Sequence, residues 1–237
     1  MLVVIPSKNR AGKITSHKVI KSAKIYVSSS EFHIYNNIYD NVISIPKEIE
    51  GITSTRNWIL KNTNEKYVIF IDDDVKSQGY IKLYNEKTKK ISMLENEWIN
   101  EWQKLFDITE QMNYKIFGVS TDGQPCSVYP YKPFLFRSYV TASCMGIIND
   151  GTYYFDEKYI VKEDYELCLR HIKERDGILC ARYLFWQNSH WNDNGGCKDY
   201  RTQNIELNAI KMLLKDYKGY IRRIERKGSN YCVRLDF

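Results

Sequence analysis

The chain has 237 residues, which is enough for one catalytic domain with a substantial core, and its 43% hydrophobic and 27% charged residues are ordinary for a soluble enzyme. No segment is apolar over the length that a bilayer requires, and the first residues form no basic leader, so we expect a cytoplasmic protein without a membrane partner. The net charge of +6 is modest, and the six cysteines show no CxxC pair or zinc-type spacing, so we expect reduced thiols.

Strand-like and helix-like segments alternate along the first part of the chain. Apolar, β-branched runs predict strands, and the segments between them predict helices, the second with Thr53 or Ser54 available as its N-cap. The strands are expected at 2–6, 24–28, 42–45 and 67–71, and the helices at about 13–21 and 53–61. This alternation predicts an α/β fold with a mostly parallel sheet flanked by helices.

The pattern is less regular beyond residue 75, where a basic, tyrosine-containing stretch occupies 80–90. Further along we expect an amphipathic helix near 96–113, a strand at 114–120, an ordered loop at 123–139 and a strand at 140–148. Gly146 lies within the last of these, which is typical of a strand whose backbone comes close to a ligand.

Three consecutive carboxylates, Asp72, Asp73 and Asp74, end the apolar run that begins at Tyr67. Such a run predicts a central strand of a parallel sheet, and ligands of these sheets bind just beyond the carboxyl ends of the strands. Asp72 and Asp74 are hard oxygen donors suited to Mg²⁺ or Mn²⁺, and a cation held by few side chains keeps positions open for phosphates. We therefore expect a substrate that carries a diphosphate. The alternative interpretation is a solvated acidic turn.

A second acidic pair, Glu163 and Asp164, opens a segment whose apolar positions recur at helical spacing. Carboxylates in a first helical turn are favoured by the helix dipole and are well mounted for general-base catalysis, although ordinary helix capping explains them equally simply. His190 is a candidate third metal ligand only because the acids upstream already suggest a metal, since an isolated histidine is usually structural.

The C-terminal region is basic and contains interleaved tyrosines, a mixture suited to phosphate contacts and base stacking. The alternative is a solvated helix face. The residues that we expect to contact nucleic acid are Arg222, Arg223, Arg226 and Lys227.

Four segments, 3–10, 55–60, 67–75 and 163–170, resemble GT-A-fold glycosyltransferases and occur in the order and approximate spacing of that family. The resemblance implies a single catalytic domain, with a nucleotide-sugar-binding half at 1–120, an acceptor and catalytic half at 121–200 and a basic helical extension at 201–237. It also implies a role for each matching residue. The donor nucleotide sugar would be bound by Pro6, Ser7, Arg10, Arg56, Asp72 and Asp73, the metal by Asp72, Asp74 and His190, while Glu163 would orient the acceptor and Asp164 would be the catalytic base.

Within that superfamily the chain most resembles the TET-associated and phage DNA glycosyltransferases, which are similar to the base J glucosyltransferase. This resemblance implies a metal-dependent inverting enzyme that moves a hexose, expected to be glucose, from a UDP-sugar to the hydroxymethyl group of a modified pyrimidine in DNA. It also implies the cytoplasm of a phage-infected host as the location. One departure is Ser28-Ser29-Ser30-Glu31, which stands where many relatives have an acidic pair that grips the nucleotide. The alternatives are a related enzyme with a polysaccharide or protein acceptor, a nucleotidyltransferase and a non-catalytic DNA-binding protein.

Overall fold

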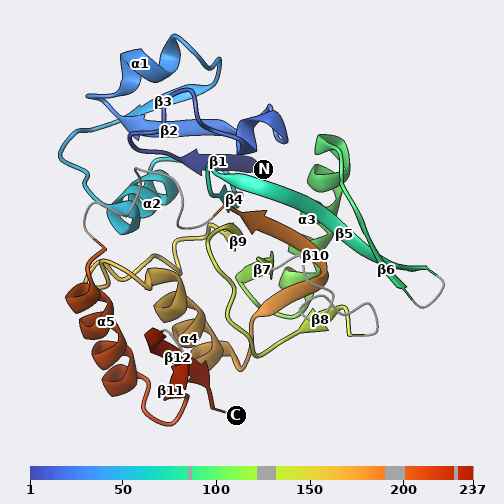
Figure 1. Cartoon of the computed structure of the whole chain (residues 1–237), viewed down its shortest axis with the longest axis vertical. Helices are drawn as coiled ribbons and strands as arrows, with labels where there is room; N and C mark the ends of the chain where they lie inside the picture. The colour runs from blue at the N-terminus through green and yellow to red at the C-terminus, as the bar shows by residue number, and fades with distance from the viewer. Residues whose placement is uncertain (85–86, 122–131, 190–200, 227–228, 237) are drawn as a thin grey trace.

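The computed structural model describes all residues except 85–86, 122–131, 190–200, 227–228 and 237. Its centre is a ten-stranded mixed sheet in the order β3-β2-β1-β4-β9-β7-β10-β5-β6, with β8 paired to β10 (Figure 1). The strands of this sheet are β1 (Leu2–Pro6), β2 (Lys24–Ser28), β3 (Val42–Ile45), β4 (Tyr67–Ile71), β5 (Val75–Tyr84), β6 (Lys87–Ile91), β7 (Ile116–Ser120), β8 (Phe134–Leu135), β9 (Cys144–Ile148) and β10 (Leu179–Asn188).

Most strands of the sheet run in one direction. The strands β1, β2, β3 and β4 are parallel neighbours, and β7 is parallel to β10. The strands β5, β8 and β9 run the opposite way. The mostly parallel, helix-flanked sheet that the sequence predicts is therefore confirmed, and all four strands expected in the first part of the chain have the predicted bounds.

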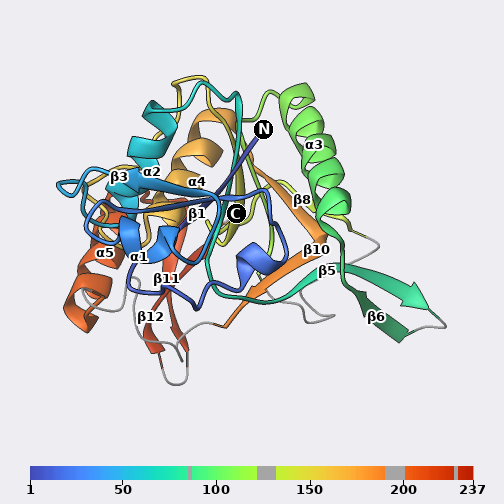
Figure 2. The ribbon, with the colours of Figure 1, turned by 90° about the horizontal axis from the view of Figure 1, so that it is seen from above.

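Two hydrophobic cores cover the two faces of the sheet, because successive strand residues point to opposite sides. One face carries Val3, Ile5, Ile69 and Ile71 and packs against the aromatic side of α3 (Glu95–Gln111). The other face packs against α2 (Ile52–Lys61) and α4 (Glu163–Arg175). Figure 2 shows α3 on one side of the sheet and α2 and α4 on the other.

The prediction of a helix at about 13–21 is wrong. That segment contains only a 3₁₀ turn, η1 (Ser16–Lys18). The segment keeps a few local turn hydrogen bonds, such as that from the Lys18 N–H to the Thr15 carbonyl. Other donors bind the acid run: the backbone N–H of Thr15 donates to the carbonyl of Asp73 at 2.9 Å, and the Ser16 hydroxyl donates to the carbonyl of Asp72. Contacts to residues far along the chain thus take the place of a continuous helix.

The helix α2 forms as expected, but neither predicted residue caps it. Its N-cap is Gly51, whose φ of 83° suits glycine. The Thr53 hydroxyl donates to the carbonyl of Tyr159 at 2.9 Å, and the Ser54 hydroxyl donates to Glu157 at 3.3 Å. Both hydroxyls therefore attach α2 to the segment that precedes α4.

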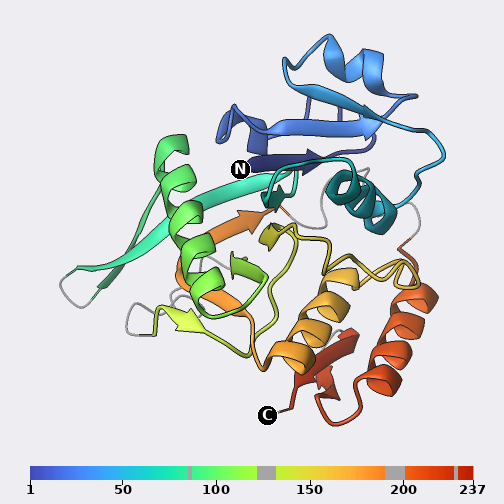
Figure 3. The ribbon, with the colours of Figure 1, turned by 180° about the vertical axis from the view of Figure 1, so that it is seen from behind.

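The C-terminal extension is helical only in its first half. The helix α5 (Gln203–Asp216) is followed by a separate hairpin of β11 (Ile221–Arg226) and β12 (Ser229–Leu235), so the expected helical extension is corrected beyond Asp216. Apolar residues of α5, of the hairpin and of α4 form a third, smaller core that joins this extension to the body. Figure 3 shows α5 beside α4, with the hairpin between them.

Packing bears on Gly146 and on three of the six cysteines. At Gly146 a Cβ atom would lie 2.2 Å from the ring of Phe117, so packing against that side chain alone requires glycine. The expected approach of a ligand there stays a prediction. Cys144, Cys168 and Cys180 are buried free thiols. In the part of the chain that the structure describes, no helix combines the length and apolar character of a membrane span. The short helix α1 (Phe32–Asn36) and strand β10 were not predicted.

Candidate active site

The acid run lies where β4 ends, against the loop that follows the neighbouring strand β1. Ser7 donates a 2.6 Å hydrogen bond to Asp73, and the Arg10 guanidinium pairs with Asp73 and lies 3.4 Å from Asp74. Burial raises the pKa of Asp73, and the Arg10 charge opposes that rise. Two residues predicted to bind the donor, Ser7 and Arg10, are therefore brought to the acids, while Pro6 ends β1 just before them.

The Asp72 carboxylate accepts hydrogen bonds from side chains at the ends of two other strands. Its Oδ2 accepts a 2.8 Å hydrogen bond from Asn188 at the end of β10 and a 3.0 Å bond from Ser143, just before β9. Its Oδ1 lies 3.7 Å from a guanidinium nitrogen of Arg56. The surrounding protein, together with the charges of Asp74 and Asp73, raises the pKa of Asp72 to about 6, although the Arg56 charge opposes the rise.

Asp74 is joined to the end of β10 through its backbone. Its carbonyl oxygen accepts hydrogen bonds from the Ser189 backbone N–H at 2.9 Å and from the Ser189 hydroxyl at 3.1 Å. His190, the predicted third metal ligand, lies outside the described residues. Its role as a ligand stays a prediction.

The fit of this site to a divalent cation is tested by its oxygen atoms. Among the described residues, no group of three or more His, Cys, Asp and Glu side chains is arranged to hold a metal. The Oδ1 atom of Asn188 is buried and has no hydrogen-bond partner in that same part of the chain, while the other side of this amide donates to Asp72. This Asn188 oxygen lies beside Asp72, whose pKa is raised by burial and by the charges of Asp74 and Asp73. Such a site suits a hard cation whose remaining ligands come from substrate and water. The residues therefore fit Mg²⁺ or Mn²⁺.

The second acidic pair occupies the first turn of α4, as predicted. Glu163 is buried, with 7% of its surface exposed, and its carboxylate pairs with the Arg56 guanidinium. Burial and the neighbouring Asp164 charge raise the pKa of Glu163 to about 7, and Arg56 opposes the rise. Asp164 is half-buried, and one of its oxygens accepts a hydrogen bond from the backbone N–H of Tyr165 at 2.9 Å.

Arg56 joins the two acidic groups. It is 4% exposed, contacts both Glu163 and Asp72, and lies over the rings of Phe155 and Phe70, with its guanidinium carbon 5.4 and 5.9 Å from their centroids. One buried side chain therefore links the end of β4 to the start of α4. Its predicted role near the donor diphosphate stays a prediction.

Sequence reasoning missed the polar residues that orient these acids. Ser143 and Asn188 hold Asp72, and the Tyr35 hydroxyl accepts a 2.8 Å hydrogen bond from the Arg10 backbone N–H and lies 3.0 Å from the Ser7 hydroxyl. The only signal for Asn188 was a polar residue that ends an apolar run, just before His190. Ser143 and Tyr35 had no signal.

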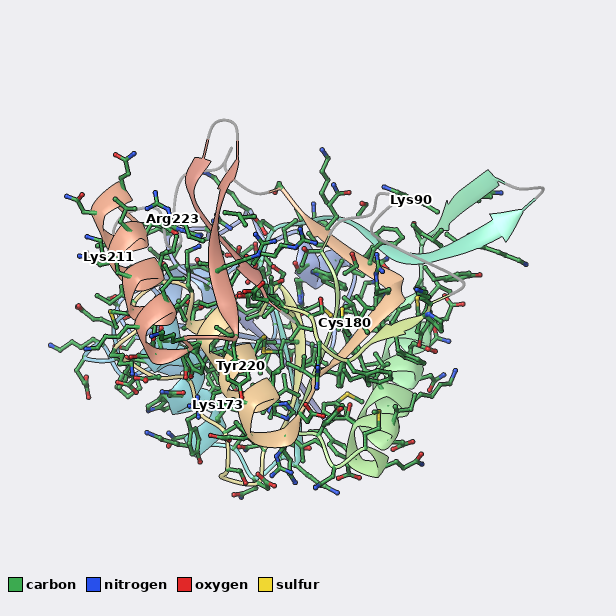
Figure 4. All side chains as sticks on the ribbon, turned by 90° about the horizontal axis from the view of Figure 1, so that it is seen from below. Lys90, Lys173, Cys180, Lys211, Tyr220 and Arg223 are labelled. Atoms are coloured by element: carbon green, nitrogen blue, oxygen red, sulfur yellow. The ribbon has the colours of Figure 1, made fainter. Side chains whose placement is uncertain are left out.

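The predicted nucleic-acid contacts lie on the C-terminal hairpin. Arg222 and Arg223 are exposed on β11, and Arg222 pairs with Asp236 at 3.1 Å. Arg226 ends that strand, and Lys227 lies outside the described residues. Figure 4 shows Arg223 on the hairpin.

Two hollows of about 510 and 810 Å³ lie away from the acids. The first lies beside α4 and α5, and the second lies beside η1 and the start of α3. Several charged groups of the first are already paired with each other, including Arg170 with Glu166 and Lys158 with Asp216. The chemistry of the acid run, and not hollow size, identifies the candidate site.

Comparison with solved structures finds the same fold in several glycosyltransferases. S. aureus TarS 1-349 in complex with UDP-GlcNAc is 14% identical with a TM-score of 0.53, and the match covers 90% of this chain and 67% of that one. The mannosyltransferase PcManGT from Pyrobaculum calidifontis, in complex with GDP-Man and Mn²⁺, is 12% identical with a TM-score of 0.55, covering 82% and 58%. Glucosyl-3-phosphoglycerate synthase from Mycobacterium tuberculosis, in complex with Mn²⁺, UDP-Glc and glycerol 3-phosphate, is 12% identical with a TM-score of 0.53, covering 98% and 85%.

These similarities confirm the GT-A fold. The chain spans 66% of the length of another TarS structure. No curated protein sequence matches it. The family model described as TET-Associated Glycosyltransferase matches residues 1–197, which is most of the 237 residues, and the chain therefore belongs to the TET-associated glycosyltransferase family.

Proposed function

We propose that the protein is a metal-dependent inverting glycosyltransferase that moves a hexose from a UDP-sugar to the hydroxymethyl group of a modified pyrimidine in DNA. The observation that carries the transfer chemistry is the arrangement around Arg56, which contacts Asp72 after β4 and Glu163 at the start of α4. The acids that would hold a metal and a diphosphate are thereby joined to the helix turn that carries the candidate base.

The donor would be held by the loop after β1 and by the acid run. Asp72, Asp74 and the Oδ1 atom of Asn188 would hold the divalent cation, with His190 as a further candidate. The cation supplies Lewis-acid neutralisation of the charge on the leaving diphosphate. Arg10 neutralises Asp73, so that this buried carboxylate does not repel the donor.

The acceptor would be activated by Asp164. Its carboxylate takes the proton of the acceptor hydroxyl while that oxygen forms a bond to the anomeric carbon and the bond from this carbon to the diphosphate oxygen breaks. A single displacement inverts the anomeric configuration. Glu163, held in place by Arg56, would orient the acceptor hydroxyl, and its pKa of about 7 lets it donate a hydrogen bond in its protonated form.

The DNA acceptor is supported by the family match and by the exposed arginines of the C-terminal hairpin. Phosphate contacts supply affinity for DNA, and enzymes that act on a base extrude it from the stack.

The decisive experiment incubates the protein with duplex DNA that contains hydroxymethylpyrimidines, a panel of nucleotide sugars and Mn²⁺, and measures the added hexose by mass spectrometry. Replacing the base, Asp164→Asn, should lower transfer by about 10²- to 10⁴-fold. UDP binding measured by titration calorimetry should stay unchanged. The matched control is Asp40→Asn, an exposed carboxylate elsewhere on the surface, which should transfer normally.

Transfer by Asp164→Asn at the wild-type rate would remove Asp164 from this role. Transfer to a polysaccharide or protein but not to DNA would replace the acceptor and leave the donor chemistry in place. A wild-type protein that binds no nucleotide in the presence of Mn²⁺ would contradict the proposal as a whole.

A further inference from the structure

The strand β5 begins directly after the acid run, pairs with β10 as far as Tyr80, and then continues with β6 as a two-stranded ribbon. Val75, the first residue of β5, follows Asp74. Figures 2 and 3 show the ribbon extending well beyond the body of the molecule, and Figure 4 shows it and the C-terminal hairpin both projecting from the upper half of that view. The ribbon therefore connects the candidate site to a surface some distance away.

The base of the ribbon is tightly fixed. The Gln78 side chain donates to the Met93 carbonyl at 2.8 Å and accepts a hydrogen bond from the Trp98 indole. At Gly79, where φ is 141°, a Cβ atom would lie 1.9 Å from the Ile91 carbonyl oxygen, so the two strands approach more closely than any side chain allows. These contacts fix the direction in which the ribbon leaves the body of the protein.

The two faces of the ribbon differ. One face is covered, because Ile81 packs against Phe185 of β10, and its cross-strand partner Lys90 lies over the same ring, with the ammonium 5.3 Å from the centroid. On the opposite face, Lys82 and Lys89 are direct cross-strand partners, and both are exposed. Directly opposed residues of an antiparallel pair have their Cβ atoms only about 5 Å apart, so like charges there are destabilising.

Acidic residues are scarce along the ribbon itself. In the sequence from Lys76 to Lys90 the single acid is Glu86, against the lysines at 76, 82, 87, 89 and 90. Two ammonium groups that repel each other on an exposed face gain free energy when a polyanion binds between them. A two-stranded ribbon also has the size that the major groove of DNA admits.

We propose that Lys82 and Lys89 form a phosphate-binding arm for the DNA that carries the acceptor base, an inference that rests on the proposed DNA acceptor. Lys82 follows Asp74 by eight residues, which at about 3.3 Å per residue places it at most ~26 Å along the ribbon from the acid run. Duplex DNA advances about 34 Å over 10 base pairs, so the contacted phosphates lie up to ~8 base pairs from the modified base.

The experiment uses two double variants with the same change of charge. The arm variant carries both Lys82→Ala and Lys89→Ala, and the control variant carries both Lys24→Ala and Lys47→Ala. Both control lysines are exposed at the other edge of the sheet. Duplexes with a single central hydroxymethylpyrimidine extend either 4 or 12 base pairs to each side. Binding is measured by fluorescence anisotropy over a series of salt concentrations, and UDP binding is measured separately.

For the long duplex, log K falls as log salt rises, and neutralising the arm should make this slope shallower by about 1.8. Each lost phosphate contact removes about 0.9 from its magnitude. The short duplex should bind both double variants equally, and UDP affinity should not change. The control variant should keep the wild-type slope on both duplexes.

An arm variant with the slope of the control on the long duplex would overturn the phosphate-binding arm while leaving the DNA acceptor in place. Equal losses on short and long duplexes would also overturn it, because the contact would then lie near the acceptor base. A wild-type protein without salt-dependent DNA binding, or one that binds linear polyphosphate but not DNA, would contradict the proposed acceptor and the arm together.

Discussion

Replacing the buried Arg56 with methionine should destabilise the protein in a way that depends strongly on pH. Methionine keeps most of the side-chain volume between Phe70 and Phe155 but removes the charge that faces Glu163. Breaking a buried ion pair that must stay charged costs about 3–5 kcal/mol. Glu163 need not stay charged, because its pKa in the folded protein is already about 7.

The size of the effect follows from proton linkage. A carboxyl whose pKa rises from 4.5 on folding lowers the free energy of unfolding as pH increases between the two values, by about 1.4 kcal/mol per pH unit. At pH 7 the raised pKa of wild-type Glu163 therefore already lowers the free energy of unfolding by about 3 kcal/mol. Without Arg56 this pKa rises further, but the additional loss of stability at pH 7 is less than about 1 kcal/mol. At pH 8.5 the wild-type carboxyl is ionised whereas the variant must still hold a proton, so the difference grows to about 2 kcal/mol.

Urea denaturation at pH 7 and pH 8.5 measures this difference. The control is Arg137→Met, which removes an exposed pair with Asp176 and should change stability by less than about 1 kcal/mol at either pH. Adding Glu163→Gln to the Arg56 variant should abolish the extra loss at high pH. The same loss at both pH values, or a loss of 3 kcal/mol or more at pH 7, would refute the reasoning. Titration with UDP tests the sequence-based expectation separately, since a side chain near the diphosphate requires weaker donor binding in the variant.

Three further predictions concern packing, pH and the C-terminal hairpin. Gly146→Ala should cost about 1–3 kcal/mol in urea denaturation because its Cβ would overlap the Phe117 ring, and Phe117→Leu in the same chain should recover part of the loss. Burial lowers the pKa of His171 from 6.5 to about 4, so stability should fall by up to about 3 kcal/mol as pH decreases through that window, and His171→Gln should lack this component of the pH profile. Arg223→Ala should reduce the affinity for long DNA in an anisotropy titration, by an amount that shrinks as salt is added; an unchanged affinity at low salt would exclude Arg223 from the DNA contact.

The strands of the first part of the chain could be predicted because burial on both faces leaves a continuous apolar run in the sequence. The run from Val68 to Ile71 is fully buried and was predicted with the bounds that the structure has. The segment 13–21 could not be predicted, since Thr15 and Ser16 donate hydrogen bonds to the backbone carbonyls of Asp72 and Asp73, more than fifty residues away. Local propensity has no information about such partners.

The candidate site, like the fold, could be predicted from the sequence only in part. The acids themselves were visible because they end an apolar run or open a helix, which are features of a single segment. Their support was not visible: Ser143 and Asn188 converge on Asp72 only because β9 and β10 join the sheet out of chain order. The sequence analysis identified the stretch 80–90 as basic but did not predict the ribbon of β5 and β6. The two faces of that ribbon differ through contacts with β10 and not through a regular alternation of residue types.

Burial is the main cause of the raised pKa values of Asp72, Asp73 and Glu163, and neighbouring negative charges add to it. Arg10 and Arg56 are the guanidinium groups that contact the acids in the described part of the site, and they face Asp72, Asp73, Asp74 and Glu163. Arg10 pairs with Asp73 and also faces Asp74, while Asp72 and Glu163 share Arg56, so two guanidinium groups face four carboxylates. A site that is left short of positive charge is less stable by itself and gains most from a bound cation, which is the expected compromise between stability and function at an active site. By the same argument, a substitution that supplies a fixed positive charge near Asp72 should stabilise the free protein while it weakens the binding of the metal and donor.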